Sequence, residues 1–165
     1  MDFRVDQKIA ASVDDVEAAQ LDPAFVARLA ELPKIGQAEL LSQEGDDEVV
    51  DQELRYVFQG ELSAAVRAVV DPRKLSWILE SRFDRVNHRS TWRILPDHYG
   101  ERLTAHGTTD LVADGLSTRR VTNGVVKVHM ALVGSRVERA IVSGLKEHAD
   151  AEAAALNAFL RERNG

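Results

Sequence analysis

The C-terminal segment, residues 134–164, constrains the fold more than any other part of the chain. It contains no proline, and apolar residues recur in it at the spacing of an amphipathic helix. The recurring positions on this face are Val137, Ala140, Ile141, Gly144, Leu145, His148, Ala151, Ala155, Leu156 and Phe159. At about 1.5 Å per residue the helix would be roughly 45 Å long. Because strands dominate the preceding sequence, we expect the helix to lie across a curved sheet, and such a pair can enclose a cavity.

Composition narrows the class of protein. The chain has 165 residues and fits a single domain over residues 1–165. Its net charge of −6 argues against nucleic acid as a partner, because phosphate binding needs a positive field. The absence of cysteine excludes disulfides, thiolate metal sites and cysteine nucleophiles. No apolar run approaches the ~20 residues of a membrane span, and the charged N-terminus is unlike a signal peptide, so we expect a cytoplasmic location.

Alternating apolar and polar residues before the terminal helix predict seven strands. We place them at residues 2–10, 35–44, 48–59, 74–84, 88–95, 101–113 and 117–130. Short turns such as Gly45–Asp47 and Asp114–Gly115 separate consecutive strands, which must therefore be antiparallel. We expect Gly124 to interrupt the alternation of the last strand as a β-bulge.

Two short helices are predicted directly after the first strand. Ser12 followed by Asp15 resembles a capping box and predicts a helix over residues 13–20. Asp22 is a good cap for a second helix, with Pro23 at its favoured first position. The order is therefore β-α-α-β6-α, an α+β fold in which a curved seven-stranded antiparallel sheet grips a long C-terminal helix.

The predicted inner faces of the strands mix large apolar residues with polar ones. The apolar positions are Trp77, Phe83, Trp92 and Leu103, and the polar positions are Gln52, Ser81, Ser90 and Thr109. A sheet packed solidly against a helix would have little need for these polar residues. The mixture favours a cavity between sheet and helix.

The order of elements and several local motifs resemble the START-like superfamily, also called SRPBCC or helix-grip proteins, and more narrowly an uncharacterised bacterial family within it. The matching stretches are the opening strand with Val13–Val16, the TWRILP of Thr91–Pro96 before a turn at Gly100, and the LVGSRVERAI of Leu132–Ile141. The resemblance covers essentially the whole chain. It implies a hydrophobic cavity, in a superfamily whose members bind lipids, sterols, hormones or polyketides, or act as cyclases, hydrolases or co-chaperone-like regulators. The superfamily has no single catalytic signature, so no catalytic residue is carried over.

The apolar face of the terminal helix is interrupted at Gly144, His148 and Glu152. His148 and Glu152 lie one helical turn apart, and if both face inward they would form an acid–base pair in which the carboxylate holds the imidazole protonated. The alternative is that the helix outruns the sheet and leaves the pair at a wet edge. Gly144 either leaves room for a ligand or allows a strand or an aromatic ring to pack closely against the helix, which is the more common role.

Other candidate residues have a structural and a functional interpretation. Tyr56, Trp77 and Trp92 are ligand-stacking walls or, as is more frequent, core residues. Arg119 faces either the cavity or solvent, depending on the bulge. The histidines at positions 88, 98 and 106 lack metal-ligand spacing and are expected in solvent. No metal ion or cofactor is expected, because no HExxH, GxSxG, P-loop or GxGxxG motif is present.

We predict that the protein binds or carries a small hydrophobic ligand, such as a lipid, sterol or polyketide-like molecule, without catalytic or metal-binding residues. The predicted ligand-binding residues are Tyr56, Trp77, Trp92, Gly144, His148 and Glu152. The segments 13–32 and 62–72 are expected at the cavity mouth, the second of them with a short helical or irregular part. Two alternatives stay open, a polyketide cyclase/aromatase-like enzyme and a protein-interaction module. The sequence is compatible with a dimer.

Overall fold

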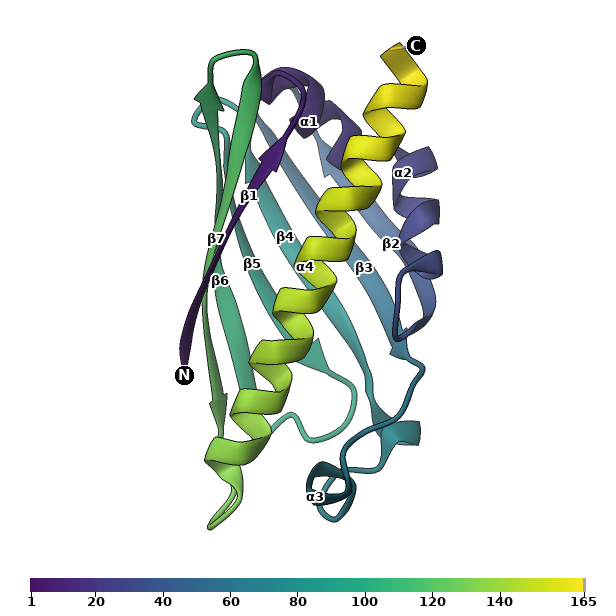
Figure 1. Cartoon of the computed structure of the whole chain (residues 1–165), viewed down its shortest axis with the longest axis vertical. Coiled ribbons are helices and arrows are strands. Elements are labelled where there is room, and N and C mark those ends of the chain that lie inside the picture. Colours follow the sequence, from purple (N-terminus) through teal and green to yellow (C-terminus); the bar gives the residue numbers. More distant parts are fainter. Residues whose placement is uncertain (165) are drawn as a thin grey trace.

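The computed structural model describes residues 1–164 and shows a curved sheet wrapped around a long helix (Figure 1). The strands are β1 Asp2–Ile9, β2 Ile35–Gly45, β3 Val49–Phe58, β4 Ser76–Asp84, β5 Arg89–Pro96, β6 Leu103–Asp114 and β7 Ser117–Val128. The helices are α1 Val13–Gln20, α2 Pro23–Arg28, α3 Ala64–Arg67 and α4 Gly134–Asn164, with short 3-10 turns at Leu29–Glu31 and Pro72–Lys74. The predicted α+β fold and its order of elements are confirmed.

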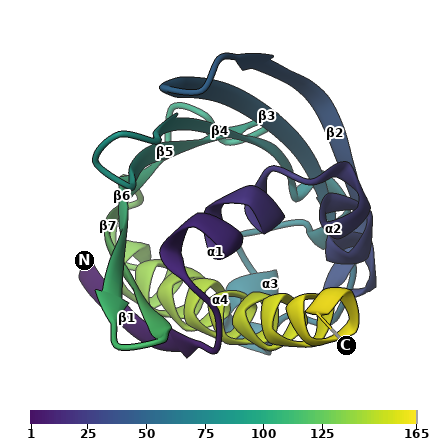
Figure 2. The ribbon, with the colours of Figure 1, turned by 90° about the horizontal axis from the view of Figure 1, so that it is seen from above.

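All seven strands form one antiparallel sheet in the order β1-β7-β6-β5-β4-β3-β2. The first two strands in the sequence, β1 and β2, are therefore the two edge strands of the sheet. Figure 2 shows the sheet as an incomplete ring, with α4 lying across the gap between its edges and α1 covering the near end. The concave face of the sheet and α4 therefore face each other.

Local caps explain where the first two helices begin. The Ser12 side chain accepts a hydrogen bond from the backbone N–H of Asp15 at 3.2 Å, and Asp22 accepts one from Ala24 at 2.9 Å. Each satisfies a backbone donor that the first helical turn leaves unpaired. Pro23 occupies the first turn of α2, as predicted.

Helix α4 packs on the rest of the chain through a face that the predicted apolar positions covered only in part: Val137, Leu156 and Phe159 are buried as expected. Val142, Ala149 and Ala153 are buried, whereas Gly144 and His148 are only half-buried. Val142 and Ala149 belong to a core cluster that also contains residues of β1, β6 and β7. The apolar face predicted from the sequence was too narrow, because α4 has two neighbouring apolar faces. One packs against β1 and β7, and the other faces the concave side of the sheet.

The predicted bulge at Gly124 is wrong. Strand β7 pairs residue for residue with both neighbours, and Gly124 lies opposite Phe3 on β1 and Gly107 on β6. A Cβ atom at Gly124 would lie 2.5 Å from Cε1 of Phe3 and 2.9 Å from Cη2 of Trp92. The two glycines thus let the Phe3 and Trp92 rings meet over the sheet, with centroids 6.2 Å apart. The pairing irregularities fall instead in β2, near Gly36 and Leu41.

This packing predicts opposite effects of alanine at two glycines. Gly124→Ala forces the Phe3 and Trp92 rings apart and should lower the free energy of unfolding by about 1–3 kcal/mol. Gly144→Ala meets nothing within 4 Å of the new Cβ, and should raise it by about 1 kcal/mol because alanine favours helix. Urea unfolding of both variants measures this difference. Effects of equal sign would contradict the packing role of Gly124.

Candidate functional site

A cavity of about 710 Å³ lies between the concave face of the sheet and α4. Its volume is in the range of small-molecule sites, and most of its lining side chains are apolar. Residues from both predicted mouth segments line it, among them Phe25 and Leu29 from the first, and Leu62 and Val66 from the second. The cavity also contains all the residues predicted to bind ligand, namely Tyr56, Trp77, Trp92, Gly144, His148 and Glu152.

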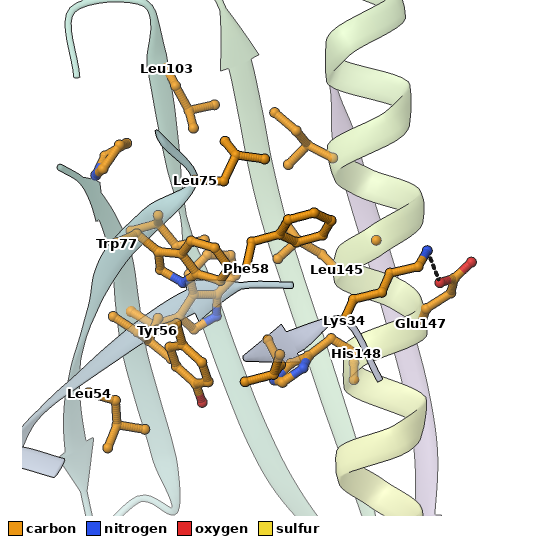
Figure 3. A pocket seen from close by; sticks show the side chains of 18 of the residues that line it. Lys34, Leu54, Tyr56, Phe58, Leu75, Trp77, Leu103, Leu145, Glu147 and His148 are labelled. Atoms are coloured by element: carbon orange, nitrogen blue, oxygen red, sulfur yellow. Dashed lines mark hydrogen bonds and ion pairs between the residues drawn. The ribbon is translucent and has the colours of Figure 1, made fainter. Parts of the chain in front are cut away.

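An aromatic wall lies on the sheet side of the cavity. Tyr56 on β3 and Trp77 on β4 are directly opposite each other in the strand register, and their rings stack at 5.6 Å with an interplanar angle of 16°. Figure 3 shows this pair facing the side of α4 that carries Leu145 and His148. Tyr56 is buried, whereas Trp77 and Trp92 are half-buried because part of each ring faces the cavity. The aromatic residues therefore act as core and as cavity wall at once.

Gly144 leaves space rather than permitting close packing. No atom lies within 4 Å of the position that a Cβ would take there, and the residue lines the cavity. Of the two interpretations of this glycine, the close-packing one is therefore wrong.

A buried polar cluster joins α4 to the sheet at the cavity wall. Nη2 of Arg120, on β7, donates to Oε2 of Glu152 at 3.0 Å. His148 lies one helical turn before Glu152, and its ring meets the Tyr56 ring edge-on at 5.7 Å. Within residues 1–164, His148 Nδ1 and Arg120 Nε and Nη1 have no hydrogen-bond partner. The predicted His148–Glu152 pair is thus replaced by an Arg120–Glu152 ion pair, and neither residue lies at a wet edge.

The environment sets the protonation of these groups. Burial lowers the pKa of His148, and the nearby Arg120 charge lowers it further against the opposing effect of Glu152. The expectation that a carboxylate keeps this imidazole protonated is therefore wrong. Burial raises the pKa of Glu152, but the charge interactions with Arg120 and His148 and the hydrogen bond from Arg120 together outweigh it, and the net shift is downward. Burial raises the pKa of the Tyr56 hydroxyl well above its usual range, so it stays protonated.

Arg120 is the site residue that the sequence interpretation missed. Because β7 has no bulge, successive residues point to opposite faces of the sheet, and Thr118, Arg120 and Thr122 share one face, where all three are buried; on the other face Asn123 is exposed, although Val121 is buried. Arg119 lies on the outer face, where it pairs with Asp6. The signal was present in the alternation of the strand, and the assumed bulge obscured it.

The edge of the cavity is crossed by an exposed ion pair. Lys34 Nζ lies 2.9 Å from Oε2 of Glu147 on α4, and both residues line the cavity (Figure 3). Half or more of each side chain is exposed to solvent, so the pair contributes little stability.

The remaining histidines lie apart from the polar cluster. His88 is half-buried rather than in solvent, because its Nδ1 lies 3.2 Å from Oε2 of the buried Glu17. His98 is exposed, although it contributes to the cavity lining, and His106 is exposed on the sheet. In the part of the chain that the structure describes, no group of three or more His, Asp and Glu side chains is arranged to hold a metal ion. No helix among residues 1–164 combines the length and the apolar composition needed to cross a membrane.

Comparison with known proteins places the chain by family and by fold. Residues 4–160 match the family model described as "Protein of unknown function (DUF2505)". No curated protein sequence matches the chain.

Several solved structures share the fold. TTHA0849 from Thermus thermophilus is 16% identical with a TM-score of 0.71, over 96% of this chain and 99% of that one. The Zhui aromatase/cyclase from Streptomyces sp. R1128 is 15% identical with a TM-score of 0.69, over 100% and 96%. A START superfamily protein from Mycobacterium smegmatis is 15% identical with a TM-score of 0.61, over 98% and 97%. The START-like, helix-grip fold implied by the sequence resemblance is thereby confirmed, and identities this low establish the fold alone.

The lowered pKa of His148 predicts a specific pH dependence. Because the pKa of His148 is lower in the folded chain than the ordinary 6.5, the unfolded chain takes up the proton first as pH falls through that value. The folded state is therefore at its full stability with respect to this group above about pH 6.5, where His148 is neutral in both states, and it loses stability as the pH falls below that value. We expect the free energy of unfolding to fall more between pH 7.5 and 5.5 in the wild type than in His148→Gln.

Urea unfolding at both pH values, together with an NMR titration of the histidine ring signals, measures this effect. A His148 midpoint at or above 6.5, or equal pH dependence in the two proteins, would contradict the assignment of a neutral buried ring.

Proposed function

Because this chain belongs to the DUF2505 family of proteins of unknown function, we propose its function from its own geometry: it binds or carries a small hydrophobic ligand. The ligand, of lipid, sterol or polyketide-like character, occupies the cavity between the sheet and α4. The observation that carries the proposal is a cavity of about 710 Å³ with mainly apolar lining, bordered by a helix that has a glycine where a large side chain would fit.

The driving force is the removal of apolar surface from water. At about 25 cal/mol per Å², a ligand that buries about 250 Å² of apolar surface gains about 6 kcal/mol before the cost of its lost freedom is subtracted. Aromatic side chains supply much of this contact area, because they are large and lose little conformational entropy. Trp77 and Trp92, each with part of its ring facing the cavity, are suited to this role.

The six predicted residues divide by role in this proposal. Tyr56, Trp77 and Trp92 contact the apolar body of the ligand. Gly144 leaves the space beside α4 that the ligand occupies. The polar residues on the next turns of α4, His148 and Glu152, orient it.

A polyketide cyclase/aromatase-like enzyme is the second candidate. The observation in its favour is the neutral His148 in the cavity wall, since a deprotonated imidazole can accept a proton from a substrate. The geometry supports it less than binding, because Glu152 is engaged by Arg120 and does not orient the imidazole. A protein-interaction module gains least support, because the interior holds a cavity rather than a filled core.

An uncharged solvatochromic dye such as Nile red tests the binding function. We expect it to bind the wild type, and Gly144→Leu to weaken that binding about tenfold or more, equivalent to ~1.4 kcal/mol, because leucine fills part of the cavity. Ser143→Leu is the matched control, since it places the same side chain at an exposed position one residue earlier. Equal dye affinity in a folded Gly144→Leu variant and in the control would reject the cavity as the binding site.

Native mass spectrometry of freshly purified protein complements the dye. A co-purified molecule displaced by the dye would identify the natural ligand and support the proposal. If the dye displaces the co-purified molecule from the wild type but not from Gly144→Leu, the molecule and the dye share the cavity beside Gly144.

A further inference from the structure

The polar cluster at the cavity wall is charge-balanced, and this limits what the cavity can hold. The Arg120 side chain is 6% exposed and that of Glu152 is 21% exposed, and their opposite charges lie 3.0 Å apart. His148 is neutral and the Tyr56 hydroxyl is protonated for the reasons given above. The cluster therefore carries no net charge.

A charged ligand group would break this balance. An ionised carboxylate at this cluster could accept hydrogen bonds from the unpaired Nε and Nη1 of Arg120, but it would place a second negative charge beside Glu152, and the single charge of Arg120 would have to neutralise both. An ammonium group would instead lie near Arg120. In either case an uncompensated charge is removed from water. The free-energy cost of its desolvation exceeds the attraction to an oppositely charged residue that is already paired. The cluster thus disfavours a charged group at this wall of the cavity and favours a neutral one; the basic residues that also line the cavity, Lys34, Lys74 and Arg102, are exposed to solvent.

A hydroxyl group fits the unused hydrogen-bonding capacity of the cluster. Glu152 uses only Oε2 to bind Arg120, and a carboxylate has about four acceptor positions. The Tyr56 hydroxyl is a donor that lines the same cavity. A ligand hydroxyl both donates and accepts, so it can donate to Glu152 and accept from Tyr56. A hydrogen bond to a charged partner contributes more than one between neutral groups.

A flat ligand body fits the neighbouring wall. The stacked Tyr56–Trp77 pair presents an aromatic surface beside the cluster, and Trp77 is half-buried because it faces the cavity (Figure 3). Rings stack on such a surface in offset or edge-on arrangements that a flexible alkyl chain does not reproduce.

Resting on the proposed binding function, we infer that the ligand is an uncharged ring compound that carries a hydroxyl group, a phenol or cyclic alcohol, held between Glu152 and Tyr56. In this arrangement Arg120 is a positioning residue. It holds the Glu152 carboxylate at the cavity wall and cancels its charge.

Three probes of equal ring size test the inference: naphthalene, 2-naphthol and 2-naphthoate, titrated calorimetrically at pH 7, where the naphthol is neutral and the acid is ionised. We expect 2-naphthol to bind about tenfold more tightly than naphthalene, the value of one charge-assisted hydrogen bond, and at least about tenfold more tightly than 2-naphthoate. If 2-naphthoate binds as tightly as 2-naphthol, the inference is overturned while the proposed binding function stands. If neither naphthalene nor Nile red binds, the binding function itself fails, and the inference with it.

The variant Glu152→Gln should weaken the discrimination against the charged probe, 2-naphthoate. Removing the carboxylate charge leaves Arg120 uncompensated, so the ratio of naphthoate to naphthalene affinity should rise about tenfold or more over the wild type. An unchanged ratio would show that charge balance does not select the ligand. If Glu152→Gln does not fold, Tyr56→Phe is the replacement variant. Tyr56→Phe should reduce the ratio of naphthol to naphthalene affinity several-fold and leave the ratio of naphthoate to naphthalene affinity unchanged. A naphthol preference that survives intact in Tyr56→Phe would overturn the assigned contact.

Discussion

Helix α4 is held against the sheet along one side only, and the cavity follows from this arrangement. Val142 and Ala149 pack with the core residues of β1, β6 and β7, while Gly144 and Leu145 face the hollow of the sheet. The curvature of the sheet carries the β3 and β4 backbones away from the helix, so that, apart from contacts such as Tyr56 with His148, side chains from both sides line a common space (Figure 2). Small residues at the packed contact draw α4 close to β7, which brings Glu152 within reach of Arg120.

The Arg120–Glu152 ion pair determines the polarity of the cavity wall more than it contributes to the stability of the fold. A guanidinium removed from water is costly when alone, and Glu152 offsets much of that cost. A well-packed apolar pair can serve stability equally well, which agrees with the role proposed above for these charges in selecting a neutral ligand. The pair also fixes the direction of Glu152 across the cavity wall. Burial then determines the states of His148 and Tyr56, whose pKa values move in opposite directions, yet both toward the neutral form.

Much of the fold was predictable because its determinants are local. Alternation placed all seven strands, and Ser12 and Asp22 marked the starts of α1 and α2. The errors arose where a residue's role depends on a distant neighbour. Gly124 serves the ring of Trp92, which is two strands away, and the ionisation of His148 depends on its burial and on Arg120 from another element. The six ligand-binding candidates all line one cavity, but Arg120, the partner of Glu152, was not among them, because the expected bulge left the facing of this part of β7 open.

The two ends of the cavity are covered by elements of very different strength. At one end, Val16 of α1 and Phe25 of α2 belong to a core cluster with Ile9 and Leu156, and the buried Glu17 bonds α1 to the β4–β5 turn. At the other end, α3 is four residues long and Val66 is its only buried residue. Local opening costs least where few apolar contacts are lost. A ligand of the proposed kind would therefore exchange at lower cost past α3 than past α1, and of the two segments expected at the mouth, residues 62–72 meet this physical requirement better.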